Sequence, residues 1–176
     1  MTPGVSGAFP ITASGLATGT GQDRSLPAGS ATQFDVVVPA NAKVAQFTVR
    51  TPDAAADLDL EVYQVVGGTA VLVGESATEA ANETVVLTAP VAGTYIGYVM
   101  GFGNAPGTTT TPFTFRGASV GSGAGLGNLA VSPANPRATI GKPITLTASW
   151  SGLAAGTPYL GWIEYPDGSG TIVTVN

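Results

Sequence analysis

The sequence predicts an all-β protein built from two sandwich-like units. Apolar and polar residues alternate along many short runs, which is typical of strands with one face in a core. Turns separate these runs, because 25 glycines and 13 prolines are spread through the 176 residues. No stretch of ten or more residues has the 3.6-residue apolar period of an amphipathic helix. Many short strands with regular turn signals indicate a sandwich or a barrel.

The alternation is clearest in residues 45–50, 57–62 and 144–150, where every second residue is apolar. In the last of these runs, and in a later one, the alternation places Trp150 and Trp162 among the core residues. Further strands are expected at residues 33–38, 70–75, 83–88, 94–101, 112–117, 128–132, 159–165 and 171–175.

A glycine-rich segment divides the chain. Residues 119–127 include four glycines in their last seven positions, which makes them a flexible linker. Residues 1–118 are enough for a full-sized sandwich. Residues 128–176 are close to the lower size limit for a unit that folds alone. The sequence thus predicts a large first unit, a linker and a small second unit.

Composition and charge exclude several classes of partner. Charged residues make up only 10% of the chain, well below the roughly 25% of an average globular protein. The formal net charge is −5, and the six basic residues are scattered singly. Nucleic-acid binding needs a basic stripe, and adhesion to anionic membranes needs a basic surface, so neither partner is expected. A surface rich in Thr, Gly and Ser and poor in Lys favours a secreted, extracellular protein.

The chain contains no histidine and no cysteine. Histidine is the usual general acid–base group, a member of the Ser-His-Asp triad and a common zinc ligand. Without cysteine, disulfide bonds and thiolate chemistry are excluded. The sequence therefore predicts that this chain is not an enzyme and carries no cofactor, with calcium as the one exception considered below.

The longer unit resembles the bacterial pre-peptidase C-terminal domain. Residues 57–63 read Asp-Leu-Asp-Leu-Glu-Val-Tyr, and residues 92–95 read Ala-Gly-Thr-Tyr. These resemble the D-x-D-L-x-x-Y strand and the A-G-T-Y-x-x-x-V ending of that family, and residues 36–39 resemble its Val-Pro turn. The resemblance covers about residues 10–118. It implies a jelly-roll-like β-sandwich attached to a secreted peptidase.

The final segment resembles a shortened fibronectin type III domain, an immunoglobulin-like β unit. Residues 153–159 read Leu-Ala-Ala-Gly-Thr-Pro-Tyr, which is similar to the L-x-P-G-T-x-Y corner of that family. Tyr95 and Tyr159 each follow a Gly-Thr turn, so both are expected to form tyrosine corners. The order of the two units is similar to the C-terminal tails of secreted subtilisin-like serine peptidases. This resemblance implies a peptidase catalytic domain in the same parent chain as the partner.

The sharpest candidate site consists of Asp57, Asp59 and Glu61. Alternation places the three carboxylates on one face of a strand, about 6.5–7 Å from one to the next. Oxygen ligands suit calcium, which makes Asp57 and Asp59 candidate metal ligands if nearby carbonyls complete the site. The competing interpretation is a solvated strand face, because a straight strand spreads ligands that calcium needs to converge. A glycosidase is excluded, since these carboxylates are not opposed across a cleft.

These observations predict a non-catalytic accessory region of a secreted serine peptidase. It would tether, stabilise or position the catalytic domain or its substrate. The alternative is a standalone extracellular adhesion or carbohydrate-binding module, with an extracellular protein or a polysaccharide as its partner. An exposed aromatic strip or a large apolar patch would favour a binding role.

Overall fold

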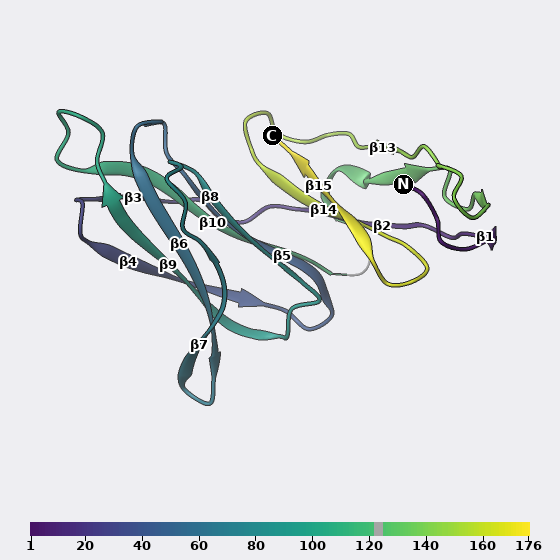
Figure 1. The fold of residues 1–176 in the computed structure, drawn as a ribbon, viewed down its shortest axis with the longest axis horizontal. Helices are drawn as coiled ribbons and strands as arrows, with labels where there is room; N and C mark the ends of the chain where they lie inside the picture. Colours follow the sequence, from purple (N-terminus) through teal and green to yellow (C-terminus); the bar gives the residue numbers. More distant parts are fainter. Residues whose placement is uncertain (122–124) are drawn as a thin grey trace. The chain divides into compact units, whose positions relative to one another are not determined.

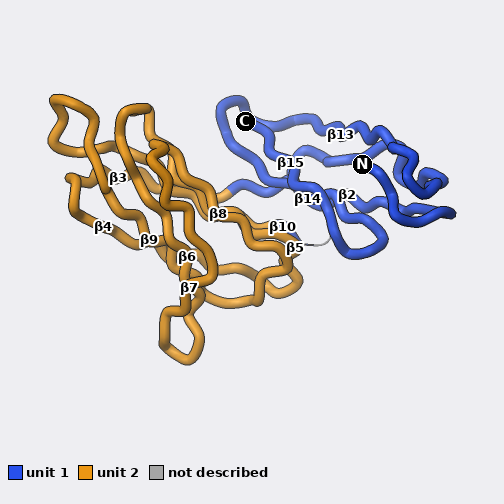
Figure 2. Tube along the Cα trace, in the orientation of Figure 1, with its two compact units in different colours: residues 1–18, 120–176 blue, residues 19–119 orange. Residues whose placement is uncertain are grey.

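In the computed structural model, which describes residues 1–121 and 125–176, the chain folds into β-strands joined by turns. The all-β prediction is therefore confirmed. A single 3-10 turn, η1 (Leu126–Asn128), is the only helical element of the described residues. Over the same ranges, the structure contains no helix with the length and apolarity needed to cross a membrane. The strands form two compact units, unit 1 (Met1–Thr18 and Val120–Asn176) and unit 2 (Gly19–Ser119) (Figure 2).

Unit 2 is a jelly-roll sandwich of two four-stranded sheets (Figure 1). One sheet has the order β3-β10-β5-β8 and the other has the order β4-β9-β6-β7. Eight strands interleaved in this way form the two Greek keys of a jelly roll, the fold expected for the longer unit. The strand bounds are β3 (Gln22–Leu26), β4 (Ala31–Val38), β5 (Ala42–Arg50), β6 (Asp57–Val66), β7 (Thr69–Ser76), β8 (Glu83–Thr88), β9 (Gly93–Gly103) and β10 (Thr111–Gly121).

The core of unit 2 is filled by the inward rows of both sheets. The apolar row of β6 is fully buried, as its alternation predicts. Phe34 of β4 and Phe115 of β10 stack with their ring centroids 4.4 Å apart. Gly97 of β9 leaves room for this pair, because a Cβ at that position would lie 2.3 Å from the Phe115 ring. Each large apolar side chain buried in this way contributes about 1.5–3 kcal/mol.

Unit 1 is a smaller β unit with three sheets. One sheet has the order β15-β14-β2, and two-stranded sheets pair β11 with β13 and β1 with β12. Ala138 of β12 and Ile163 of β14 belong to one buried cluster, against which Val131 of β11 packs. The bounds are β1 (Gly7–Ala8), β2 (Thr12–Ala17), β11 (Ala130–Ser132), β12 (Arg137–Ala138), β13 (Thr147–Ser149), β14 (Tyr159–Glu164) and β15 (Gly170–Val175).

The structure corrects the predicted boundary at the N-terminus. The sequence assigns residues 1–118 to one unit, but Met1–Thr18 belong to the same unit as the C-terminal segment. The reason is strand pairing: β2 pairs antiparallel with β14, with Ala13 opposite Ile163. Leu16 of β2 is almost completely buried in this unit.

The segment predicted as a flexible linker lies partly in regular structure. Of residues 119–127, the first three end strand β10 and the last two begin η1, while residues 122–124 lie outside the described residues. The chain passes between the units a second time after Thr18. Unit 2 is thus inserted into unit 1, and residues 128–176 make up only part of a unit.

Both predicted tyrosine corners are present. The buried Tyr95 hydroxyl donates a hydrogen bond to the Val91 carbonyl at 2.7 Å. The Tyr159 hydroxyl accepts a hydrogen bond from the Ala154 N–H at 3.1 Å. Trp162 is buried as predicted, but the prediction for Trp150 is wrong, because this side chain is 44% exposed. The reason is that β13 ends at Ser149, so the inward alternation stops before the tryptophan.

Candidate functional site

The acidic residues of β6 lie on the outward side of their sheet. Asp57, Asp59 and Glu61 are half-buried and alternate with the fully buried apolar row of the same strand. Their predicted placement on one strand face is confirmed. The strand repeat separates neighbouring members by about 6.5–7 Å, so the carboxylates form a row and do not converge on one point.

Aromatic and apolar side chains accompany this acidic row. In the β6–β9 ladder Glu61 lies opposite Tyr98, and Tyr63 lies opposite Ile96. The rings of Tyr63 and Tyr98 meet edge to face, with centroids 6.5 Å apart. The Tyr63 hydroxyl donates to the Glu61 carboxylate at 2.5 Å, and this hydrogen bond raises the pKa of Tyr63. We call the surface made of Asp57, Asp59, Glu61, Tyr63, Ile96 and Tyr98 the outer face.

The two sheets of the jelly roll differ in charge. The strands of the β4-β9-β6-β7 sheet carry five acids and neither Lys nor Arg. The strands of the β3-β10-β5-β8 sheet carry four of the six basic residues of the chain, with two acids, Asp23 and Glu83. The basic residues of unit 2's strands are therefore confined to one sheet, and the outer face belongs to the other.

The carboxylates of the outer face crowd one another. Burial raises the pKa of Asp57, and the negative charges of Glu79 and Glu83 raise it further. Burial also raises the pKa of Asp59, with added repulsion from Asp57, Glu83 and Glu61. One enclosed oxygen of the Asp57 carboxylate has no hydrogen-bond partner among the described residues. A cationic group bound here would stabilise the ionised form of these acids.

Glu83 is a buried acid that the sequence analysis did not single out. Its side chain is 2% exposed at the start of β8, and its carboxylate accepts hydrogen bonds from the hydroxyls of Ser76 and Thr78. Arg50 donates to the Glu83 carbonyl at 2.8 Å. These bonds fasten the β7–β8 connection beside the outer face. No local sequence pattern predicts these hydrogen bonds, because Glu83 resembles an ordinary polar residue at the start of a strand.

Calcium at Asp57 and Asp59 remains a prediction. Over residues 1–121 and 125–176, no three His, Cys, Asp or Glu side chains are grouped so as to hold a metal ion. Calcium takes six to eight oxygen ligands, so a site here would depend on backbone carbonyls and water for most of them. The row geometry suits several separate cationic groups better than one ion.

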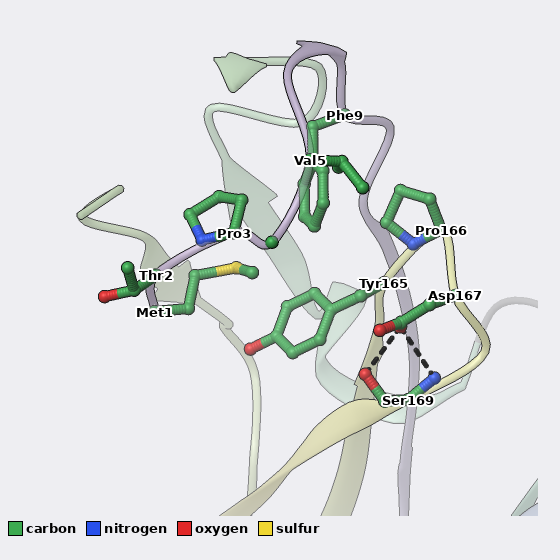
Figure 3. Close-up of a pocket in the computed structure, with 10 residues that line it drawn as sticks. Met1, Thr2, Pro3, Val5, Phe9, Tyr165, Pro166, Asp167 and Ser169 are labelled. Carbon is green, nitrogen blue, oxygen red and sulfur yellow. Dashed lines mark hydrogen bonds between the residues drawn. The ribbon is translucent and has the colours of Figure 1, made fainter. Parts of the chain in front are cut away.

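Unit 1 contains an open cleft of about 500 Å³. Its walls are mostly apolar and include Phe9, whose ring centroid lies 6.2 Å from that of Tyr165 (Figure 3). Asp167 is its acidic lining residue, and this carboxylate accepts hydrogen bonds from the Ser169 N–H at 3.0 Å and the Ser169 hydroxyl at 2.6 Å. These bonds lower the pKa of Asp167. The carboxylate thereby holds the turn between β14 and β15.

No protein-family model matches the chain, and the search of curated proteins found no match to its sequence.

Proposed function

We propose that this chain is a non-catalytic, extracellular binding module that acts as the accessory region of a secreted serine peptidase. The observation that carries the binding role is the outer face, where the half-buried Tyr63–Tyr98 pair lies among carboxylates on a sheet whose strands have no Lys or Arg. Tyrosine combines an apolar ring with a polar hydroxyl and is enriched where proteins bind their partners. The accessory role is supported by the jelly-roll topology, which is the fold that the pre-peptidase resemblance implies.

The binding role is tested by co-sedimentation of the purified chain with chitin, cellulose and insoluble elastin. Tyr98→Ala should lower binding at least several-fold, because it removes one ring of the half-exposed Tyr63–Tyr98 pair. Trp150→Ala is the matched control, since it removes an exposed aromatic side chain from unit 1. Equal losses from both variants, or binding that neither variant changes, would refute the assignment to the outer face.

The choice of polymer separates the two kinds of module. Retention on elastin alone supports a peptidase accessory that holds protein substrate. Retention on chitin or cellulose supports the standalone carbohydrate-binding alternative, which the exposed Phe102 ring on β9 also favours. The accessory role is tested directly by the sequence of the gene that encodes this chain. That gene should also encode a peptidase catalytic domain.

The calcium prediction belongs to the same surface. If Asp57 and Asp59 bind calcium, added calcium should raise the Tm of unit 2 above its value in chelator, because a ligand that binds only the folded state stabilises it. Equal melting temperatures would dispose of the calcium site.

A further inference from the structure

The outer edge of β7 is an uncovered apolar edge. This strand ends its sheet, with β6 as its hydrogen-bonded neighbour. Among the described strands, β7 alone has five consecutive exposed residues, which are residues 69–73. They include Val71, 47% exposed, and Leu72, 46% exposed. In Figure 1 the β6–β7 hairpin extends beyond the neighbouring strands of its sheet.

Residues 69–72 of this edge lack the usual protection against strand pairing. Proteins blunt sheet edges with charged side chains, prolines or bulges. At the other edge of the same sheet, β4 carries Asp35 and is followed by Pro39. The run Thr-Ala-Val-Leu-Val-Gly of β7 contains neither charge nor proline. The bulge of the β6–β7 ladder follows Leu72, so residues 69–72 form a regular ladder whose other side is open.

We propose that the edge of β7 adds an extended strand from a basic partner protein. This inference deepens the proposed binding function, on which it rests, by naming the partner's chemistry. A strand added beside β7 would continue the sheet, and its alternate side chains would join the outward surface next to Leu72 and Glu75. The matching strand has apolar residues beside Leu72 and a Lys or Arg beside Glu75.

Charge decides which partner this edge accepts. Glu75 lies directly opposite Glu61 in the ladder, and like charges in that position repel. The four strands of this sheet hold five acids and no basic residue, and the β6 acids lie toward the Glu75 end of β7. An added strand with Lys or Arg beside Glu75 therefore gains attraction at that end. A second copy of this chain would bring the same five acids. A nucleic acid would bring phosphates, which these acids also repel.

The test is a titration of the isotope-labelled 176-residue chain with two synthetic peptides, followed by backbone amide NMR shifts. Both peptides consist of valine and threonine with one charged residue, placed to lie beside Glu75, which is lysine in one peptide and glutamate in the other. The lysine peptide should shift the amides of residues 69–75 and bind at least ten-fold more tightly than the glutamate peptide. Raising the salt concentration from about 0.05 to about 0.5 M should weaken binding of the lysine peptide several-fold, since exposed charges are then screened.

Two lysine variants locate the site. Leu72→Lys adds a positive charge to the open edge. It should weaken binding of the lysine peptide at least ten-fold. Val37→Lys is the matched control, because Val37 is 74% exposed on β4, the other edge of the same sheet. This control should leave the affinity unchanged. The two positions are both exposed, so neither variant disturbs the core.

The outcomes separate this inference from the function on which it rests. Equal affinities for the two peptides, binding of neither, or equal losses from both variants would overturn the strand addition. Shifts at Tyr63 and Tyr98 with none in residues 69–75 would also overturn it, while the outer face would stand as a binding surface. Loss of polymer binding by Tyr98→Ala, measured separately, tests the proposed function without using the β7 edge.

Discussion

Tyr95 shows how one hydroxyl can fix a sandwich end. Its ring is buried beside Phe47, and its hydroxyl donates to the Val91 carbonyl at 2.7 Å. Tyr95→Phe keeps the ring and removes the bond, so it should lower the free energy of unfolding by about 0.5–1.5 kcal/mol. Urea unfolding followed by circular dichroism measures this. Tyr98→Phe, on the half-exposed outer face, should have a smaller effect, and an equal loss in both variants would contradict the corner's role.

The acids of β6 make a second prediction, which concerns pH. Burial and neighbouring carboxylates raise the pKa of Asp57 and Asp59 in the folded chain above the value of about 3.9 expected when unfolded. The folded state then binds more protons, so stability falls as the pH rises from about 4 through the raised pKa values. Asp57→Asn with Asp59→Asn should therefore raise the urea midpoint at pH 7 and change it little at pH 4.

Asp35→Asn serves as the control for that measurement, because Asp35 is an exposed carboxylate on β4, away from the acidic row. Its effect on the midpoint measures the loss of one exposed charge from the same sheet. A double variant that is less stable at pH 7 would show that Asp57 and Asp59 have a stabilising counter-ion. If chelator abolished that difference and added calcium restored it, the counter-ion would be calcium.

Part of the candidate site could be predicted from the local sequence. Period-two alternation was enough to place Asp57, Asp59 and Glu61 together, because a strand face is a local property. The ring of Tyr98 beside Glu61 depends on which strand pairs with β6 and in which register, and this information lies outside any local window. Glu83 was missed for a different reason, because its partners are near in sequence but nothing in the sequence marks them as bonded to it. Its burial follows from hydroxyls supplied by Ser76 and Thr78 across a turn.

Among the elements, β9 carries the clearest test of sheet packing. Gly97 faces the stacked rings of Phe34 and Phe115, and a Cβ there would approach the Phe115 ring to 2.3 Å. Gly97→Ala should therefore cost about 1–3 kcal/mol of stability through overpacking. Gly103→Ala is the control on the same strand, since its nearest neighbour would be at an ordinary 3.5 Å. Equal urea midpoints for the two variants would show that the sheets can separate to accept a methyl group.

The strands that the sequence failed to predict are those without apolar alternation. β2 reads Thr-Ala-Ser-Gly-Leu-Ala and β3 reads Gln-Asp-Arg-Ser-Leu, so each contains one large apolar residue. Both form because partners are available: β2 pairs with β14, and β3 pairs with β10. Tertiary pairing overrides weak local preference in such segments. By contrast, the predicted strand at residues 83–88 coincides with β8, whose inward row is apolar after Glu83.

At the scale of the whole chain, the insertion of unit 2 into unit 1 is the feature that local patterns could not reveal. The chain enters the jelly roll through β3 and leaves it through β10, and these strands pair antiparallel. Arg116 of β10 donates to the Gly19 carbonyl at 2.7 Å, which holds the entry and the exit together. Domains with adjacent ends tolerate insertion into another unit. Glycines near residue 120 therefore mark one of two crossings, and the crossing after Thr18 carries no comparable sequence signal.

This topology predicts that residues 1–18 are essential to unit 1 and dispensable to unit 2. Phe9, Ile11 and Leu16 are buried in unit 1, and at about 1.5–3 kcal/mol each they contribute about 5–9 kcal/mol, comparable to the whole stability of a small domain. Both tryptophans lie in unit 1, so their fluorescence reports on that unit alone. A chain of residues 19–176 should show red-shifted emission, because the buried Trp162 becomes solvated. It should still show the cooperative circular-dichroism transition of isolated residues 19–119. Blue-shifted emission from the shortened chain would mean that residues 120–176 fold without β2, and the two-segment unit would then be refuted.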